Sequence, residues 1–179
     1  MKRSINNTLA IKLAILFMAN CIPFTSFANE DSAPGVNPKD NITKAEAFYK
    51  YENYKDSAFL HSLTFKYDKA FDANWGGNIE LPVLTYDGFG VDENGIGDIA
   101  ARARYIKFGS KWTFIAGAEA VFPTASADAL GAGKYQINPS GGFVYSLKPG
   151  VFIFGGYKHL ISVAGDRDRN DINSSQPRL

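Results

Sequence analysis

The feature that most constrains this chain is a period of two in its hydrophobicity, which recurs along nearly all of residues 44–163. In 44–54 the odd positions include Ala45, Ala47, Tyr49 and Tyr51, whereas lysine and glutamate occupy most of the even ones. Because successive side chains of a strand point to opposite faces, this pattern predicts a strand with one apolar and one charged face. The same alternation is found in 58–69, 74–85, 97–108, 111–122 and 135–147. Segment 151–163 is also strand-like, but its start is apolar on both faces, so its facing stays open.

The connections between these segments alternate in length. Short turns are expected at 70–73, 109–110 and 148–150, and longer polar loops at 86–96, 123–134 and 164–174. A strand of about 11 residues rises about 3.3 Å per residue and, at a tilt near 40°, spans about 28 Å. The apolar band of an outer-membrane barrel is about 25 Å tall. We therefore predict an all-β fold, an antiparallel up-and-down transmembrane β-barrel.

Aromatic residues near the predicted strand ends favour the same interpretation, because barrels in the outer membrane carry aromatic girdles at both interfaces. The residues concerned are Trp75, Tyr86, Tyr105, Trp112, Tyr135 and Tyr145. The alternative is a secreted or periplasmic β-barrel, or a soluble sandwich, whose apolar face points inward and binds an apolar ligand. Soluble strands average about 5–6 residues, which favours the membrane. The two hypotheses differ in what Phe65, Leu81, Phe114 and Phe143 contact, lipid or an apolar interior. A structural envelope protein without transport is a third hypothesis.

The N-terminus has the pattern of a secretory leader. Lys2 and Arg3 precede an apolar stretch at 13–19, and Ser26 and Ala28 are small residues at the positions read by a signal peptidase. We predict a signal peptide over 1–28 cleaved after Ala28, a flexible lead-in over 29–43 and a partial barrel domain over 44–179. The single cysteine, Cys21, would leave with the leader. The expected location is the bacterial outer membrane, with lipid and the barrel-assembly machinery as partners.

The charge balance excludes some partners. Removing the leader takes three of the 19 basic residues and none of the 18 acidic ones, which leaves a net charge of −2 without a basic block. A nucleic-acid partner is therefore not expected. The oligomeric state does not follow from the sequence.

Five charged residues on the predicted inner face are the candidate functional site: Glu80, Asp98, Arg102, Arg104 and Glu119. They lie on three adjacent predicted strands and carry opposite signs. They could line the lumen as a constriction or a steering patch. Equally, a barrel interior must pair its charges whether or not it transports anything.

Neither an enzyme nor a metal or cofactor site is predicted. His61 and His159 are dispersed, no Gly-x-Ser-x-Gly elbow occurs, and parity places no serine beside a histidine on the same face. His61 falls on the apolar face as an interfacial residue. The acidic loop residues Asp166, Asp168 and Asp171 alternate with arginines, which disfavours a bound cation.

Glycines and prolines give further local predictions. Residues 130–134 hold two glycines but no Gly-Lys-Ser/Thr, so we expect a loop or bulge with unusual backbone angles rather than a phosphate loop. Pro82 and Pro139 fall within predicted strands and indicate bulges or strand ends.

Several segments resemble a known family. They are 95–99 (GIGDI), 119–124 (EAVFPT), 130–139 (LGAGKYQINP), 158–159 (KH) and 164–169 (AGDRDR). In this order they resemble the outer-membrane family named for the meta-pathway of phenol degradation, over most of 44–179. The resemblance implies a barrel of roughly a dozen strands and passive passage of small hydrophobic compounds across the outer membrane.

Residues 175–179 look like the opening of a further strand. About seven strands plus the start of an eighth cannot close, because the smallest bacterial membrane barrels have about 8. An open edge in lipid would leave backbone groups unpaired. We therefore expect a fragment of a longer protein, or a chain that closes only by pairing with others.

Overall fold

The computed structural model describes residues 41–54, 58–148 and 151–178, and these residues form β-strands and a single short helix. The strands are β1 (Lys44–Tyr54), β2 (Ala58–Ala70), β3 (Trp75–Gly88), β4 (Val91–Ile96), β5 (Ile99–Lys107), β6 (Trp112–Phe122), β7 (Lys134–Lys148), β8 (Val151–Gly165) and β9 (Asn173–Arg178). The helix is a single 3-10 turn, η1 (Asp128–Leu130). Within the described ranges, no helix has the length and apolarity to cross a membrane. The predicted signal peptide and most of the predicted lead-in lie outside the described residues.

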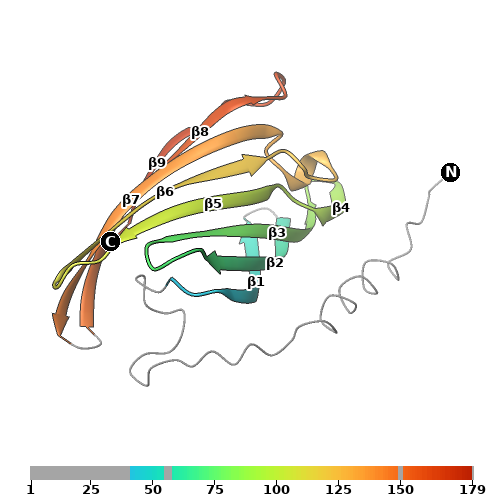
Figure 1. Ribbon diagram of the computed structural model, residues 1–179. Coiled ribbons are helices and arrows are strands. Elements are labelled where there is room, and N and C mark those ends of the chain that lie inside the picture. Colours follow the sequence, from blue (N-terminus) through green and yellow to red (C-terminus); the bar gives the residue numbers. More distant parts are fainter. Residues whose placement is uncertain (1–40, 55–57, 149–150, 179) are drawn as a thin grey trace. The chain divides into compact units, whose positions relative to one another are not determined.

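All the strands belong to one antiparallel sheet in the order β1-β2-β3-β5-β6-β7-β8-β9, with β4 paired to β3 alone. Apart from β4 and β5, which both pair with β3, strands that follow one another in sequence are neighbours in space, which confirms the predicted up-and-down arrangement. The sheet curls into a half-barrel (Figure 1). In the described part of the chain β1 pairs only with β2 and β9 only with β8, so these strands form its two edges.

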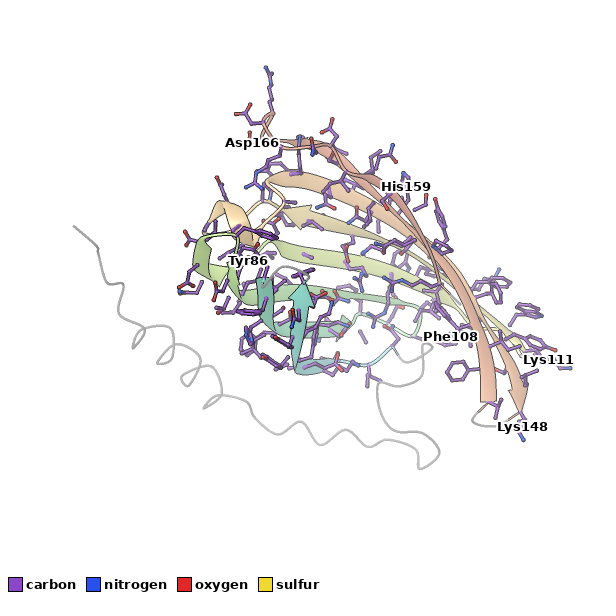
Figure 2. The ribbon with its side chains drawn as sticks, turned by 180° about the vertical axis from the view of Figure 1, so that it is seen from behind. Tyr86, Phe108, Lys111, Lys148, His159 and Asp166 are labelled. Carbon is purple, nitrogen blue, oxygen red and sulfur yellow. The ribbon has the colours of Figure 1, made fainter. Side chains whose placement is uncertain are left out.

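The two ends of the strands differ. Phe108, Lys111 and Lys148 lie at one end, where the short turns are, and Tyr86 and Asp166 lie at the other (Figure 2). We call these the turn end and the loop end. The alternation of short and long connections predicted from the sequence thus corresponds to two distinct rims.

One predicted loop is in fact a strand. Residues 86–96 were expected to be a long polar loop, but β3 continues to Gly88 and turns back into β4 through Phe89 and Gly90. Both turn residues have positive φ, 52° and 80°, as a tight two-residue hairpin requires. Strand β4 was missed because five of its six residues are exposed and its three central residues, 92–94, are polar, so it shows no apolar alternation. At the other edge, β9 begins at Asn173, two residues before the predicted start.

The register sorts the side chains into two faces. On one face Lys66 lies opposite Glu80, and Arg102 lies opposite Glu119. On the other face Phe65 lies opposite Leu81, and Phe114 lies opposite Phe143. We call these the polar face and the apolar face.

Burial on the two faces is the reverse of that in a soluble protein. The polar-face residues Asp68 and Glu119 are only 1% and 6% exposed, whereas the apolar-face residues Ile79 and Phe114 are 51% and 55% exposed. Phe65, Leu81 and Phe143 on the same apolar face are half-buried. Because the inner side of a curled sheet is the shielded one, the polar face is the concave wall and the apolar face is the outer surface.

Aromatic side chains form clusters on the apolar face near both ends of the strands. At the turn end Trp75 lies 5.0 Å from Tyr105 and Trp112 lies 4.6 Å from Tyr145, measured between ring centroids. At the loop end Tyr135 packs edge-on against Phe122. Of the six aromatic residues predicted for girdles, Tyr86 is the exception. It pairs with Leu60 at an even position of β3 and therefore belongs to the polar face.

Pro82 and Pro139 lie inside strands rather than at strand ends. At Pro82 the register along β3 shifts by one residue, because residues 81–82 lie opposite the three residues 97–99. Pro82 sits where β3 changes partner from β5 to β4, and its carbonyl accepts a hydrogen bond from the Gly97 N–H. Pro139 pairs with Ala118 of β6 at a place where the ladder between β7 and β8 has no residue pair. Both prolines thus occupy positions where the sheet does not need their missing N–H.

Candidate functional site on the polar face

Two buried carboxylates organise the polar face, and Asp68 of β2 is the first. The Arg104 guanidinium donates a hydrogen bond to its Oδ1 at 2.7 Å, and the Asn78 amide donates to the same oxygen at 3.2 Å. The Lys66 ammonium lies 3.3 Å from Oδ2, although without the direction of a hydrogen bond. One carboxylate therefore neutralises charge from two cations on strands β2 and β5.

Glu119 of β6 plays the same role three strands further along the sheet. Its Oε1 accepts hydrogen bonds from Lys158 at 2.6 Å and from Asn138 at 3.1 Å, and its Oε2 is held by Arg102. The register explains this arrangement, because Arg102 and Asn138 are the direct cross-strand neighbours of Glu119 on either side. Glu80 is a more distant partner, 4.0 Å from Arg102.

Together the two clusters connect six consecutive strands of the concave wall: β2, β3, β5, β6, β7 and β8. A buried charge that loses its partner costs about 3–5 kcal/mol. Each carboxylate is therefore a structural tie and, at the same time, a way to hold cationic side chains on the inner wall. The structure is therefore compatible with both hypotheses for these charges, a role in lining the lumen and a purely structural pairing.

The five predicted site residues do not form one group. Glu80, Arg102 and Glu119 come together, and Arg104 belongs to the neighbouring Asp68 cluster. Asp98 is apart from both: it lies just before β5 and its carboxylate accepts hydrogen bonds from the backbone N–H groups of the loop after β6, at Ala125 (3.2 Å) and Ala132 (2.7 Å). Asp98 thus fastens a loop.

Sequence reasoning missed most of the partners in these clusters: Lys66, Asp68, Asn78, Asn138 and Lys158. A signal existed for Lys66 and Asp68, since parity placed them on the charged face of their strand. Lys158 lay in the segment whose facing was open. Its pairing with Ser140 of β7 settles that it belongs to the polar face.

Between the clusters, the polar face forms a cavity of about 220 Å³. Its charged lining consists of Lys66, Arg102, Arg104, Lys158 and Arg178. The rest of the lining includes Asn78, Ile115, Ser140, Phe154 and four glycines of β6, β7 and β8.

The loop end carries a separate set of ion pairs. Lys134 donates a hydrogen bond to Asp171 at 2.8 Å, which lowers the pKa of the Asp171 carboxyl. The Asp166 carboxylate accepts the backbone N–H of Asp168 at 2.9 Å, and Arg169 lies 3.4 Å from Asp128. Within the described ranges, histidine, cysteine and acidic side chains form no group of three that could hold a metal ion.

The glycine-rich segment 130–134 contains the unusual backbone angle that was predicted. Gly133 has a φ of 67°, a conformation that favours glycine. Its carbonyl accepts the backbone N–H of Asp166, which fastens the loop after β8 to the start of β7.

One statement from the sequence is wrong: a serine does lie beside a histidine. β9 pairs Ser175 with His159 on the apolar face, and Ser175 Oγ lies 3.4 Å from His159 Nδ1 and 2.8 Å from the Tyr157 hydroxyl. Parity failed because the facing of β8 was open and the register of β9 was unknown. The group is exposed. His61 lies beside Tyr49 and Tyr51, on the apolar face as expected.

These features define a class of protein: an antiparallel β half-barrel with paired charges on its concave wall and aromatic side chains on its outer surface. The sequence model of the family described as "Putative MetA-pathway of phenol degradation" matches residues 56–157. The chain belongs to this family. No curated protein and no solved structure gives a significant match.

Proposed function

We propose that the chain forms the wall of an outer-membrane β-barrel that lets small hydrophobic, aromatic-type compounds enter the cell passively. The observation that carries this proposal is the reversed burial of the two faces. A sheet that shields Glu119 and exposes Ile79 is stable where its outer surface meets an apolar medium. In water such a surface would be a liability, because it extends over several strands.

The lengths of the strands also support a location in a lipid bilayer. Strands β2, β3, β7 and β8 have 13 to 15 residues. At about 3.3 Å per residue and a tilt near 40°, the shortest of them spans about 33 Å, more than the roughly 25 Å apolar band of an outer membrane. The aromatic clusters at both ends of the strands match the two interfaces of such a band.

The solute class follows from the family and from the site. The family description names phenol degradation, whose starting compounds are small aromatic molecules. The function requires no cofactor and no catalytic residue, because diffusion through a barrel needs only a lined passage. Outer-membrane lipid and the barrel-assembly machinery are the partners that this function implies, with a cleaved leader for export.

The competing hypothesis, a periplasmic barrel with an apolar ligand inside, requires an apolar interior. The concave wall of the described sheet instead carries Asp68, Asn138 and Glu119, all buried. This observation favours the membrane protein.

Cell fractionation combined with an uptake assay tests the proposal. Cells that produce the full chain should hold it in the outer membrane, as a band whose gel mobility changes on heating, and should take up radiolabelled toluene faster than cells without it. The matched control is Ile79→Arg, which puts a charge on the outer surface and should lower the amount of folded chain in the outer membrane. A soluble periplasmic product, or toluene uptake that is the same with and without the chain, would contradict the proposal.

A further inference from the structure

The cavity on the polar face has an imbalance of charge. Its lining contains five cations, and no carboxylate among the described residues lines it. The carboxylates of Asp68 and Glu119 are buried in the wall, where each is shared between two of those cations. Of these five cations, Glu46 reaches only Lys66, at 3.8 Å, and Glu80 only Arg102, at 4.0 Å; Glu46 lies closer to Lys44, at 2.9 Å. Five cations thus face four carboxylates and, among the charged residues that the structure describes, only the cations border the empty space.

Arg178 of β9 contributes most to this excess. Its cross-strand neighbour is Gly156 of β8, which places it on the polar face. Among the described residues its guanidinium reaches only the amide oxygen of Gln176, at 3.5 Å, and no carboxylate. A guanidinium has five N–H donors in a fixed fork that fits a carboxylate. Arg178 therefore presents unused donors to the cavity.

The wall beside these cations is bare because glycines line it. Gly142 of β7 pairs with Gly156 of β8, so no side chain rises from the sheet at that point. A side chain could not be accommodated at these glycines without a shift of the backbone. A Cβ at Gly142 would come within 2.8 Å of the Gly155 carbonyl oxygen, and a Cβ at Gly117 within 2.8 Å of the Ala103 carbonyl oxygen. The depression is thus built into the close approach of the strands.

Apolar groups complete the lining. Ile115 of β6 and Phe154 of β8 are half-buried and belong to the same face. The volume of about 220 Å³ is below the roughly 300–1,000 Å³ of sites for drug-sized ligands, so the cavity suits a compound with a single ring. A site with excess positive charge and an apolar side matches a ring that carries one negative group.

We propose that this cavity binds small aromatic anions, with the carboxylate of the solute on the Arg178 guanidinium and Lys158, and its ring against Phe154. The inference rests on the proposed function, because it names the kind of aromatic solute that the barrel selects. Binding on the inner wall would raise the local concentration of such anions in the passage.

Equilibrium dialysis of the full chain, folded in detergent micelles, tests this with radiolabelled benzoate and with benzyl alcohol as its uncharged counterpart. Benzoate should bind at least about tenfold more tightly, since a charge-assisted hydrogen bond is about twice as strong as a neutral one. Arg178→Gln should weaken benzoate binding about tenfold, and Arg178→Lys, which keeps the charge but not the fork, should weaken it less. Arg167→Gln, which removes an arginine that does not line this cavity, should leave binding unchanged.

Equal affinities for benzoate and benzyl alcohol, no benzoate binding, or equal effects of Arg178→Gln and Arg167→Gln would each overturn the inference. Heat-dependent gel mobility establishes that each variant is folded. Within the described ranges Arg178 has no carboxylate partner to lose, so its variants should fold. Toluene uptake by cells separates the two proposals. If toluene uptake depends on the chain while benzoate binding is absent, the anion site fails and the proposed function stands.

Discussion

The two faces of the sheet have the same backbone and very different chemistry. On the polar face stability comes from specific partners, as in the contacts of Glu119 with Arg102 and Lys158. On the apolar face side chains such as Ile79 and Phe114 are largely exposed, and their contribution depends on the surrounding medium. A mutation on the polar face therefore measures how much the charge pairs stabilise the fold, whereas a mutation on the apolar face shows whether that surface meets lipid or water.

The largest effect is expected from Glu119→Gln. The change leaves Arg102 and Lys158 without the shared carboxylate in a buried place, so the free energy of unfolding should fall by about 3–5 kcal/mol. Urea titration of the folded band on unheated gels measures it. Glu80→Gln is the control, because Glu80 is only a distant partner and should cost less than about 1 kcal/mol. Similar losses for the two variants would contradict the assigned role of Glu119.

The next effect tests the medium of the apolar face. Ile79→Arg should destabilise the chain in bilayers by about 2–4 kcal/mol, the cost of arginine near the midplane of an outer membrane. At an exposed site of a soluble protein the same change would stay within about 0.5 kcal/mol. Phe89→Arg at the tip of the β3–β4 hairpin is the control and should be neutral. Unfolding titrations in lipid vesicles distinguish these values, and a neutral Ile79→Arg would argue against a lipid-facing surface.

A charge exchange sharpens the comparison on the polar face. Arg102→Glu and Glu119→Arg each break the pair, whereas the double variant restores opposite charges across the same register position. The coupling free energy between the two sites should be about 0.5–3 kcal/mol in favour of the double variant. If the double variant folds but takes up toluene at a different rate, the pair also shapes the passage. Unchanged uptake with restored folding would assign it a structural role alone.

The smallest effect concerns the loop end. Because Lys134 holds the pKa of Asp171 below its ordinary value, the folded state binds this proton less readily than the unfolded state. The contribution of the Lys134–Asp171 pair to the free energy of unfolding is therefore present above the unfolded pKa of about 3.9. It disappears as the pH falls through the lower pKa of the folded state. Asp171→Asn should be slightly less stable than the parent chain at pH 7 and equal to it in strong acid. Urea midpoints across this pH range measure the difference, and a gap that persists in strong acid would contradict the mechanism.

Much of the fold could be predicted from the sequence because alternation is a local property. The pattern around Phe65 and Lys66 placed them on opposite faces without reference to any other strand. The family followed from short segments such as 130–139, and the family match over 56–157 confirms it. Strand β4 escaped prediction because its exposed polar residues leave no periodic signal.

The candidate site was predictable only in part. Parity placed Arg102 and Glu119 on the polar face, but their partners come from strands far along the chain, such as Lys158 of β8. Which residues meet depends on the register, and the register is fixed by all the strands together. For the same reason Asp98, predicted as a site residue, is found fastening a loop, and Ser175 is found beside His159.

The sequence by itself therefore determined the all-β class, the positions of seven long strands and the two faces of the sheet, because period-two patterning is written into neighbouring residues. Only the tertiary structure decided which charges pair, that the polar face is the concave one, and that cations without an adjacent carboxylate border a cavity beside Gly142. The physical reason is that curvature, burial and cross-strand contact arise between strands, and no single strand contains them.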